Sequence, residues 1–84
     1  MAGAITARFF AKVCAVTGVD TTTAVHCQSD IARPLGITDE ETWDAVDDLL
    51  AAGLLEPALL SGVHVRLTAT GGQRCIEYQR RGVD

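Results

Sequence analysis

Residues 30–56, DIARPLGITDEETWDAVDDLLAAGLLE, decide the fold of this chain, because helix-start and helix-stop signals follow one another along them. Gly36 tolerates a left-handed backbone, so it permits a tight turn between two helices. Thr38 and Glu41 have the Thr-x-x-Glu spacing of a capping box, in which each side chain accepts a hydrogen bond from the backbone N–H of the other residue. The stretch therefore predicts a short helix, a tight turn and a second helix over about 38–52.

This second helix has an apolar face and an acidic face. Asp39 and Glu40 stand in its first turn, where the helix dipole favours negative charge. Gly53 comes directly after the expected end of the helix at about residue 52, where glycine commonly ends a helix. The residues expected on the buried face are Ala45, Val46, Leu49, Leu50 and Ala52.

Upstream, residues 2–17 predict another helix. Apolar residues recur there every three or four positions, which is the spacing of one helix face. That face consists of Ile5, Phe9, Val13 and Val16. Gly18 is expected to end the helix.

The segment between these two helices fits two descriptions. Apolar residues at 24, 27, 31 and 35 have helical spacing, which favours a helix over about 22–33. Pro34 disfavours helical geometry at the residue before it, so the helix is expected to end there. Alternatively, the β-branched stretch 21–27 is extended, and residues 28–33 form a separate short helix with Ser29 near its cap.

Downstream, the chain predicts a hairpin and a last helix. Residues 63–68 alternate between apolar and polar, which is typical of a half-buried strand, and residues 54–56 supply its partner strand. Thr68 can cap a final helix over about 69–80. The apolar side of that helix is expected to consist of Cys75, Ile76 and Tyr78.

Length and composition restrict the class of protein. The chain has 84 residues, of which 48% are hydrophobic and 21% charged, so it can form one packed domain and is not a disordered chain. No apolar run approaches the ~18 residues of a membrane span, so no membrane partner is expected. No secretory signal is visible at the start, so the expected location is cytoplasmic.

The three cysteines, Cys14, Cys27 and Cys75, are odd in number, and their spacing matches neither a zinc site nor a redox pair. In a reducing cytosol we expect them to be small buried hydrophobic residues, and we expect no metal and no cofactor. The sequence also lacks a phosphate-binding loop and a glycine-rich dinucleotide loop. We therefore expect no enzymatic activity.

The order helix, helix, tight turn, helix, hairpin, helix resembles the winged helix-turn-helix superfamily, most nearly the MarR-type regulators. The residues that carry the resemblance are Ile31-Ala32 with Leu35-Gly36-Ile37, Leu49 with Gly53-Leu54-Leu55, and Leu67-Thr68 with Gly71. The resemblance covers about half of the chain. It implies a mainly α fold with a small β-hairpin, forming a single winged helix-turn-helix domain over residues 1–84. This fold serves DNA-binding proteins and protein-interaction modules alike.

The charge of the helix after the turn favours the second role. Residues 38–56 carry a net charge of −7 and no Lys or Arg, and the rest of the chain carries +3. Such a helix would repel the phosphates of a major groove. The lone tryptophan, Trp43, is either a core residue or an aromatic anchor at an interface. The leading hypothesis is therefore a protein-interaction or dimerisation module that acts through this acidic helix. Its expected protein partner is basic and is bound by Trp43, Glu40, Asp44 and Asp47.

The alternative hypothesis is a small DNA-binding transcription regulator. It would use His64 and Arg66 on the hairpin and Arg74 on the last helix, together with the arginines at 80 and 81. These bases form two small groups, a poor match for the ~6–10 phosphate contacts of a strong DNA-binding protein. We therefore expect weak binding to duplex DNA or none.

A homodimer is also expected. The first and last helices carry more apolar residues than a small core needs to cover, and most soluble homo-oligomers pair with two-fold symmetry. The residues that suggest this are Ile5, Phe9, Phe10, Val13, Ile76 and Tyr78.

Overall fold

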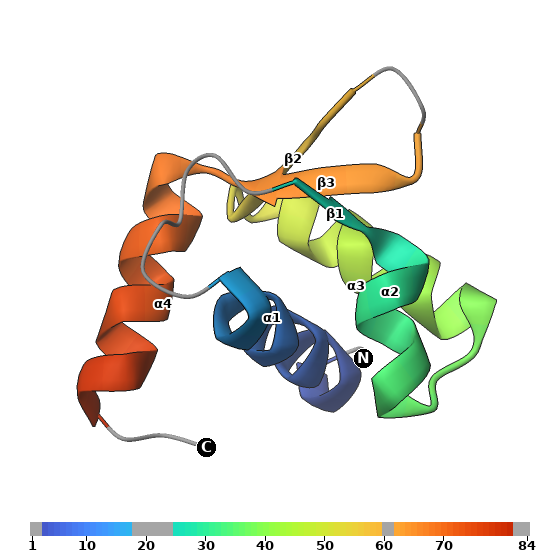
Figure 1. The fold of residues 1–84 in the computed structure, drawn as a ribbon, viewed down its shortest axis with the longest axis horizontal. Helices are drawn as coiled ribbons and strands as arrows, with labels where there is room; N and C mark the ends of the chain where they lie inside the picture. Colours follow the sequence, from blue (N-terminus) through green and yellow to red (C-terminus); the bar gives the residue numbers. More distant parts are fainter. Residues whose placement is uncertain (1–2, 18–24, 60–61, 82–84) are drawn as a thin grey trace.

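The computed structural model describes residues 3–17, 25–59 and 62–81, and of residues 78–81 it describes the backbone alone. Four helices and three strands form the described part (Figure 1). The helices are α1 (Gly3–Thr17), α2 (Gln28–Ala32), α3 (Asp39–Ala51) and α4 (Ala69–Arg81), with a single 3₁₀ turn, η1 (Arg33–Leu35), after α2. The strands are β1 (Val25–Cys27), β2 (Leu55–Pro57) and β3 (His64–Leu67). The predicted mainly α architecture with a small antiparallel sheet is confirmed at this level.

The sheet is antiparallel, with β3 between β1 and β2. The predicted hairpin is present, since Leu55 pairs with Leu67 and Glu56 with Arg66. The edge strand β1 is an addition, because Val25 also pairs with Arg66 from the other side.

The prediction of one helix over about 22–33 is wrong for the part that the structure describes. Residues 25–27 are extended, and α2 begins only at Gln28, as in the alternative description. Pairing with β3 satisfies backbone groups of the short extended segment, and Gln28 N donates to Val63 O at 2.9 Å. Residues 18–24, including the predicted stop at Gly18, lie outside the described part.

The signals around α3 behave as the sequence predicts. Thr38 Oγ1 accepts from Glu41 N at 3.0 Å, and Glu41 Oε1 accepts from Thr38 N at 2.9 Å, which completes the capping box. Gly36 before the helix and Gly53 after it have φ values of 68° and 74°, which only glycine adopts without strain. Ala52 is exposed rather than buried, because it is the C-cap and lies beyond the last helical turn.

The core lies between α1, α3 and the inner face of the sheet. Phe9 and Val13 on α1 are fully buried, and Phe10 is almost so. The remaining members are Cys14, Ile31, Ala32, Ala45, Val46, Leu49, Leu54, Leu55, Val65, Leu67 and Cys75. Phe9, Phe10 and Val13 are therefore not spare apolar surface, and the homodimer prediction loses that part of its argument.

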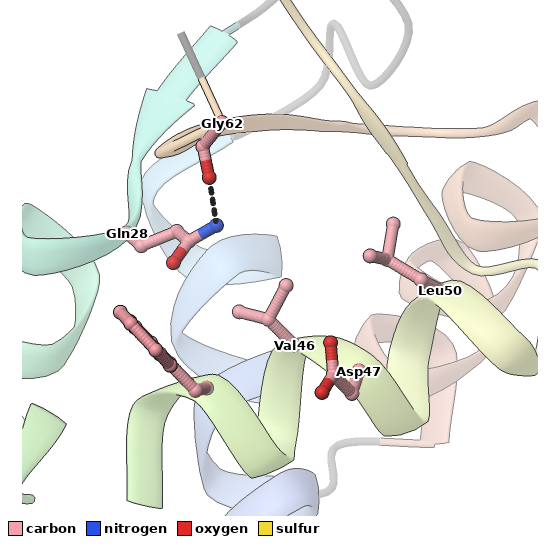
Figure 2. Close-up of a pocket in the computed structure, with 6 residues that line it drawn as sticks. Gln28, Val46, Asp47, Leu50 and Gly62 are labelled. Atoms are coloured by element: carbon pink, nitrogen blue, oxygen red, sulfur yellow. Dashed lines mark hydrogen bonds between the residues drawn. The ribbon is translucent and has the colours of Figure 1, made fainter. Parts of the chain in front are cut away.

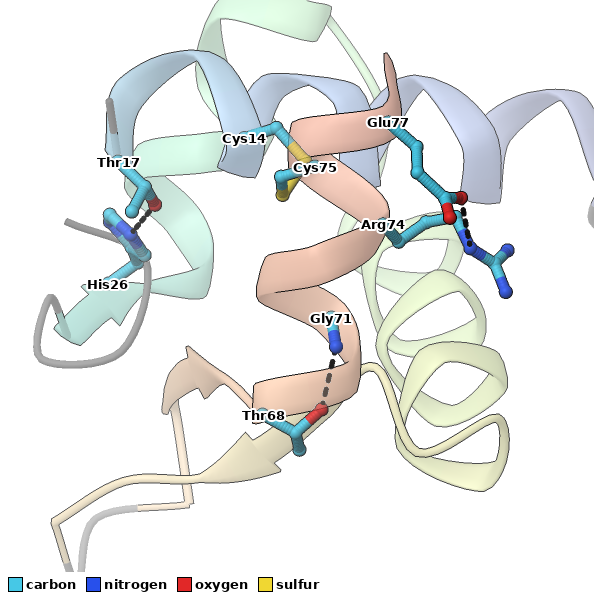
Figure 3. The surroundings of a disulfide bond; sticks show 8 residues. All are labelled: Cys14, Thr17, His26, Thr68, Gly71, Arg74, Cys75 and Glu77. Atoms are coloured by element: carbon cyan, nitrogen blue, oxygen red, sulfur yellow. Dashed lines mark hydrogen bonds and ion pairs between the residues drawn. A yellow bond between two sulfur atoms is a disulfide. The ribbon is translucent and has the colours of Figure 1, made fainter. Parts of the chain in front are cut away.

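Helix α4 is joined to α1 by a disulfide bond between Cys14 and Cys75 (Figure 3). Both residues are buried, as predicted, but the expectation of reduced thiols is wrong. The two cysteines are 61 residues apart, and only the packing of α1 beside α4 brings their Cα atoms to 5.3 Å. Thr68 caps α4 as predicted, since its Oγ1 accepts from Gly71 N at 2.9 Å.

Within residues 3–17, 25–59 and 62–81, no helix has the length and apolar character needed to cross a bilayer.

Candidate functional site

The outward face of α3 carries the residues that the sequence predicted for a partner. Glu40, Trp43, Asp44 and Asp47 are three or four residues apart, so they share one side of the helix, and all four are exposed. The indole of Trp43 is 66% exposed. The interpretation of Trp43 as a core residue is therefore wrong.

The carboxylates on this face form no ion pair with the described residues. In the part of the chain that the structure describes, the side chains of Glu40, Asp44 and Asp47 have no ion pair and no hydrogen bond. Two other acids of α3 are occupied, because Glu41 completes the capping box and Asp48 Oδ2 accepts from Thr6 Oγ1 at 3.0 Å. The outward carboxylates thus produce an uncompensated negative field beside the indole.

A shallow open hollow of about 250 Å³ adjoins this face (Figure 2). On α3 it is lined by Trp43, Val46, Asp47 and Leu50. Trp43 and Asp47 are about one helical turn apart, as are Val46 and Leu50. The opposite wall consists of Gln28 at the start of α2 and Gly62 just before β3. The hollow therefore has an apolar floor of buried Val46 and half-buried Leu50, and a polar rim.

Gln28 is the least expected member of the hollow. Its side chain is only 9% exposed, and its Nε2 donates to Gly62 O at 3.5 Å. The amide oxygen of Gln28 points toward α3 (Figure 2), and no group among the described residues donates to it. Sequence reasoning missed Gln28 and Gly62 because the pairing of β1 with β3 brings them together, and the favoured helix over 22–33 precluded that pairing.

Among the described side chains, the bases predicted for DNA do not form a comparable surface, and the side chains of the arginines at 80 and 81 lie outside the described part. Arg66 Nε lies 2.6 Å from Glu56 Oε2 on the neighbouring strand, and Arg74 Nε lies 3.8 Å from Glu77 Oε1 (Figure 3). His64 is half-buried on β3. The two arginines thus sit on different elements, each beside a carboxylate that reduces its attraction for phosphate.

Cys27 is the free cysteine among the described residues, and it is half-buried. Its Sγ lies 3.2 Å from Ser29 Oγ, and this hydrogen bond lowers the pKa of the thiol. Next to it, His26 Nε2 lies 2.7 Å from Thr17 Oγ1, and burial lowers the pKa of the imidazole. Cys27 and His64 are paired across the sheet. In the described part of the chain, no three His, Cys, Asp or Glu side chains are arranged to hold a metal ion.

Among the described side chains of α1 and α4, few large apolar ones are exposed. Val16 on α1 and Ile76 on α4 are each 47% exposed, and the side chain of Tyr78 lies outside the described part.

Comparisons with protein-family models, with curated proteins and with solved structures find no match to this chain.

Proposed function

We propose that this chain is a single winged-helix domain that acts as a non-enzymatic protein-interaction module, and that the outward face of α3 binds its partner. The element order supports the first part of the proposal. Helices α2 and α3 are joined by a tight turn at Gly36, a hairpin follows, and β1 pairs with the second strand of that hairpin. In this description α2 and α3 form the helix-turn-helix unit, and β2–β3 is the wing.

The exposure of Trp43 is the observation that carries the functional part. A large indole in water adds little to the stability of the fold, whereas a buried one gives an interface much of its binding energy. Trp43 also lies among polar residues at the edge of a hollow, which is the usual setting of an interface anchor.

The charges on α3 indicate the chemistry of the partner. Glu40, Asp44 and Asp47 are exposed and have no ion-pair partner among the described residues, so they attract a basic segment and repel an acidic one. A partner with a basic, partly apolar segment would bury the indole and neutralise these carboxylates at the same time.

The pairing of Arg66 and Arg74 with carboxylates weakens the DNA alternative. A DNA-binding protein gains its nonspecific affinity by neutralising phosphates with free cations. On a winged helix bound in the usual way, α3 would enter the major groove, and its acidic face would oppose the phosphates.

The fluorescence of Trp43 tests the proposal directly, because it is the only tryptophan of the chain. The protein is titrated with a short peptide rich in Arg and Leu, with the same peptide carrying Glu in place of every Arg, and with random duplex DNA. We expect the emission to shift to shorter wavelength with the basic peptide alone, and the affinity to fall as salt is added.

Two results would overturn the proposal. One is an unchanged emission spectrum with all three ligands. The other is tight binding of the duplex with a steep salt slope that Arg66→Ala reduces by about one unit, which would identify a DNA-binding protein.

A further inference from the structure

The hollow beside Trp43 is small, with a volume suited to one side chain. Its volume is about 250 Å³, whereas sites for small-molecule ligands are commonly about 300–1,000 Å³. It is partly open to solvent, so a chain lying across α3 could place a single residue in it.

The lining calls for a side chain with an apolar stem and a cationic end. Val46 and Leu50 offer an apolar floor, and an Arg or Lys side chain buries its methylene stem on such a surface. Asp47 adds a carboxylate that has no partner among the described residues. Trp43 adds an exposed indole, the aromatic group that attracts cations most strongly.

The distribution of acceptors favours arginine over lysine. Asp47 on α3 and Gln28 on α2 both line the hollow, and the carboxylate of the first and the amide oxygen of the second can both accept hydrogen bonds. A guanidinium group has five N–H donors in a planar fork, so it can donate to both groups while its plane stacks on an indole. An ammonium group is a compact point charge and does not stack in this way.

We propose that the hollow is a recognition pocket for one arginine side chain of a partner protein. The guanidinium group donates to Asp47 and to Gln28 and stacks on Trp43, and its stem covers Val46 and Leu50. This inference rests on the proposed function, because it specifies how a basic partner is read by the same face of α3.

The test replaces each arginine of the basic peptide in turn by citrulline, which has the same shape without the charge. At one position we expect this change to weaken binding about tenfold, because a charge-assisted hydrogen bond is lost there. At the other positions we expect smaller effects. Lysine at that position is expected to recover only part of the affinity.

Matched protein variants locate the pocket. Asp47→Asn and Asp44→Asn remove the same charge from the same exposed face of α3, but only Asp47 lines the hollow. We expect Asp47→Asn to weaken binding about tenfold and Asp44→Asn less than about twofold, because a charge outside the pocket acts only through screened solvent. In Asp47→Asn, citrulline at the sensitive position should cause little further loss, since the two changes remove one interaction.

The outcomes separate this inference from the proposed function. Equal losses for Asp47→Asn and Asp44→Asn, or equal effects of citrulline at every position, would overturn the arginine pocket and leave a general acidic binding face. Failure of the basic peptide to bind wild-type protein would overturn both. Because both aspartates are exposed, an unchanged melting temperature of the two variants confirms that only binding is being compared.

Discussion

Helices α3 and α4 are both 13 residues long, but they are held in the fold by different means. Helix α3 begins in a capping box and buries Thr42, Ala45, Val46 and Leu49 along its length. Of the α4 residues 69–77, Cys75 is the one whose side chain is buried, and it is covalently bound to α1. The packing of α3 therefore leaves its outward face unused, whereas α4 buries a single side chain among residues 69–77 and is tied to α1 through it.

This difference separates stability from function on the two helices. Changes on the outward face of α3 should alter binding without altering the fold, and changes at the contacts of α4 should alter the fold without altering binding. Variants of the two helices test that separation, in order of decreasing effect on the free energy of unfolding.

The largest loss is expected on removing the disulfide. Because the two cysteines are 61 positions apart in the sequence, Cys14→Ala together with Cys75→Ala should lower the free energy of unfolding by about 4 kcal/mol, since the unfolded chain regains the entropy of an open loop. Denaturant unfolding with and without a reductant measures it. Cys27→Ala is the control, since Cys27 is free and should leave the unfolding free energy nearly unchanged.

A thiol titration tests independently whether Cys14 and Cys75 are joined by a disulfide bond. The native, unreduced protein should expose the single thiol of Cys27, and the denatured, reduced protein all three. Three reactive thiols before reduction would mean that α4 is not covalently bound to α1, and the contrast between the two helices would fail.

The next largest effect is expected at Gly71, near the start of α4. A Cβ built on this residue would overlap the carbonyl oxygen of Leu54, which is backbone and cannot turn aside. Gly71→Ala should therefore cost about 1–3 kcal/mol by displacing α4. The control is Gly3→Ala on α1, where a Cβ meets nothing within 4 Å, so the helix should be unaffected or slightly more stable. Equal melting temperatures of the two variants would contradict the close approach of Gly71 to the backbone of Leu54.

A smaller loss is expected at the start of α3. Thr38→Ala removes the oxygen that accepts from Glu41 N and should cost about 1 kcal/mol, the usual value of a helix N-cap. Thr38→Ser keeps the hydroxyl group and should retain most of the stability. A loss as large as that of the disulfide would show that the core does not hold α3 as firmly as its buried residues indicate.

The smallest effect on stability is expected at Trp43. Because the indole is exposed, Trp43→Ala should change the free energy of unfolding by less than about 0.5 kcal/mol. Chemical denaturation followed by circular dichroism measures this without the tryptophan signal. A loss of several kcal/mol would show that Trp43 supports the core, and it would contradict the proposed binding face.

The sequence predicts α3 better than any other region, because its signals are local. The capping box at Thr38, the glycines on either side and the apolar spacing of its buried face all lie within a few residues of one another. The exposure of Trp43 does not follow from these signals, since a residue next to the apolar face of a helix can point toward the core or toward solvent.

Features that depend on distant residues could not be predicted in this way. The disulfide joins cysteines on α1 and α4, and the hollow joins Gln28 and Gly62 to α3 across the sheet. Strand β1 is only three residues long and is extended because β3 lies beside it, and without that neighbour the local spacing favours a helix. The winged-helix topology and the homodimer remain predictions.

The central claim is that Trp43 binds a partner and does not support the fold. Isothermal titration of the Arg- and Leu-rich peptide into wild-type protein and into Trp43→Ala compares the two roles directly. We expect Trp43→Ala to bind about 30-fold more weakly or worse, as for a central interface residue, with an unchanged melting temperature. Equal affinity of the two proteins for the peptide would contradict the claim.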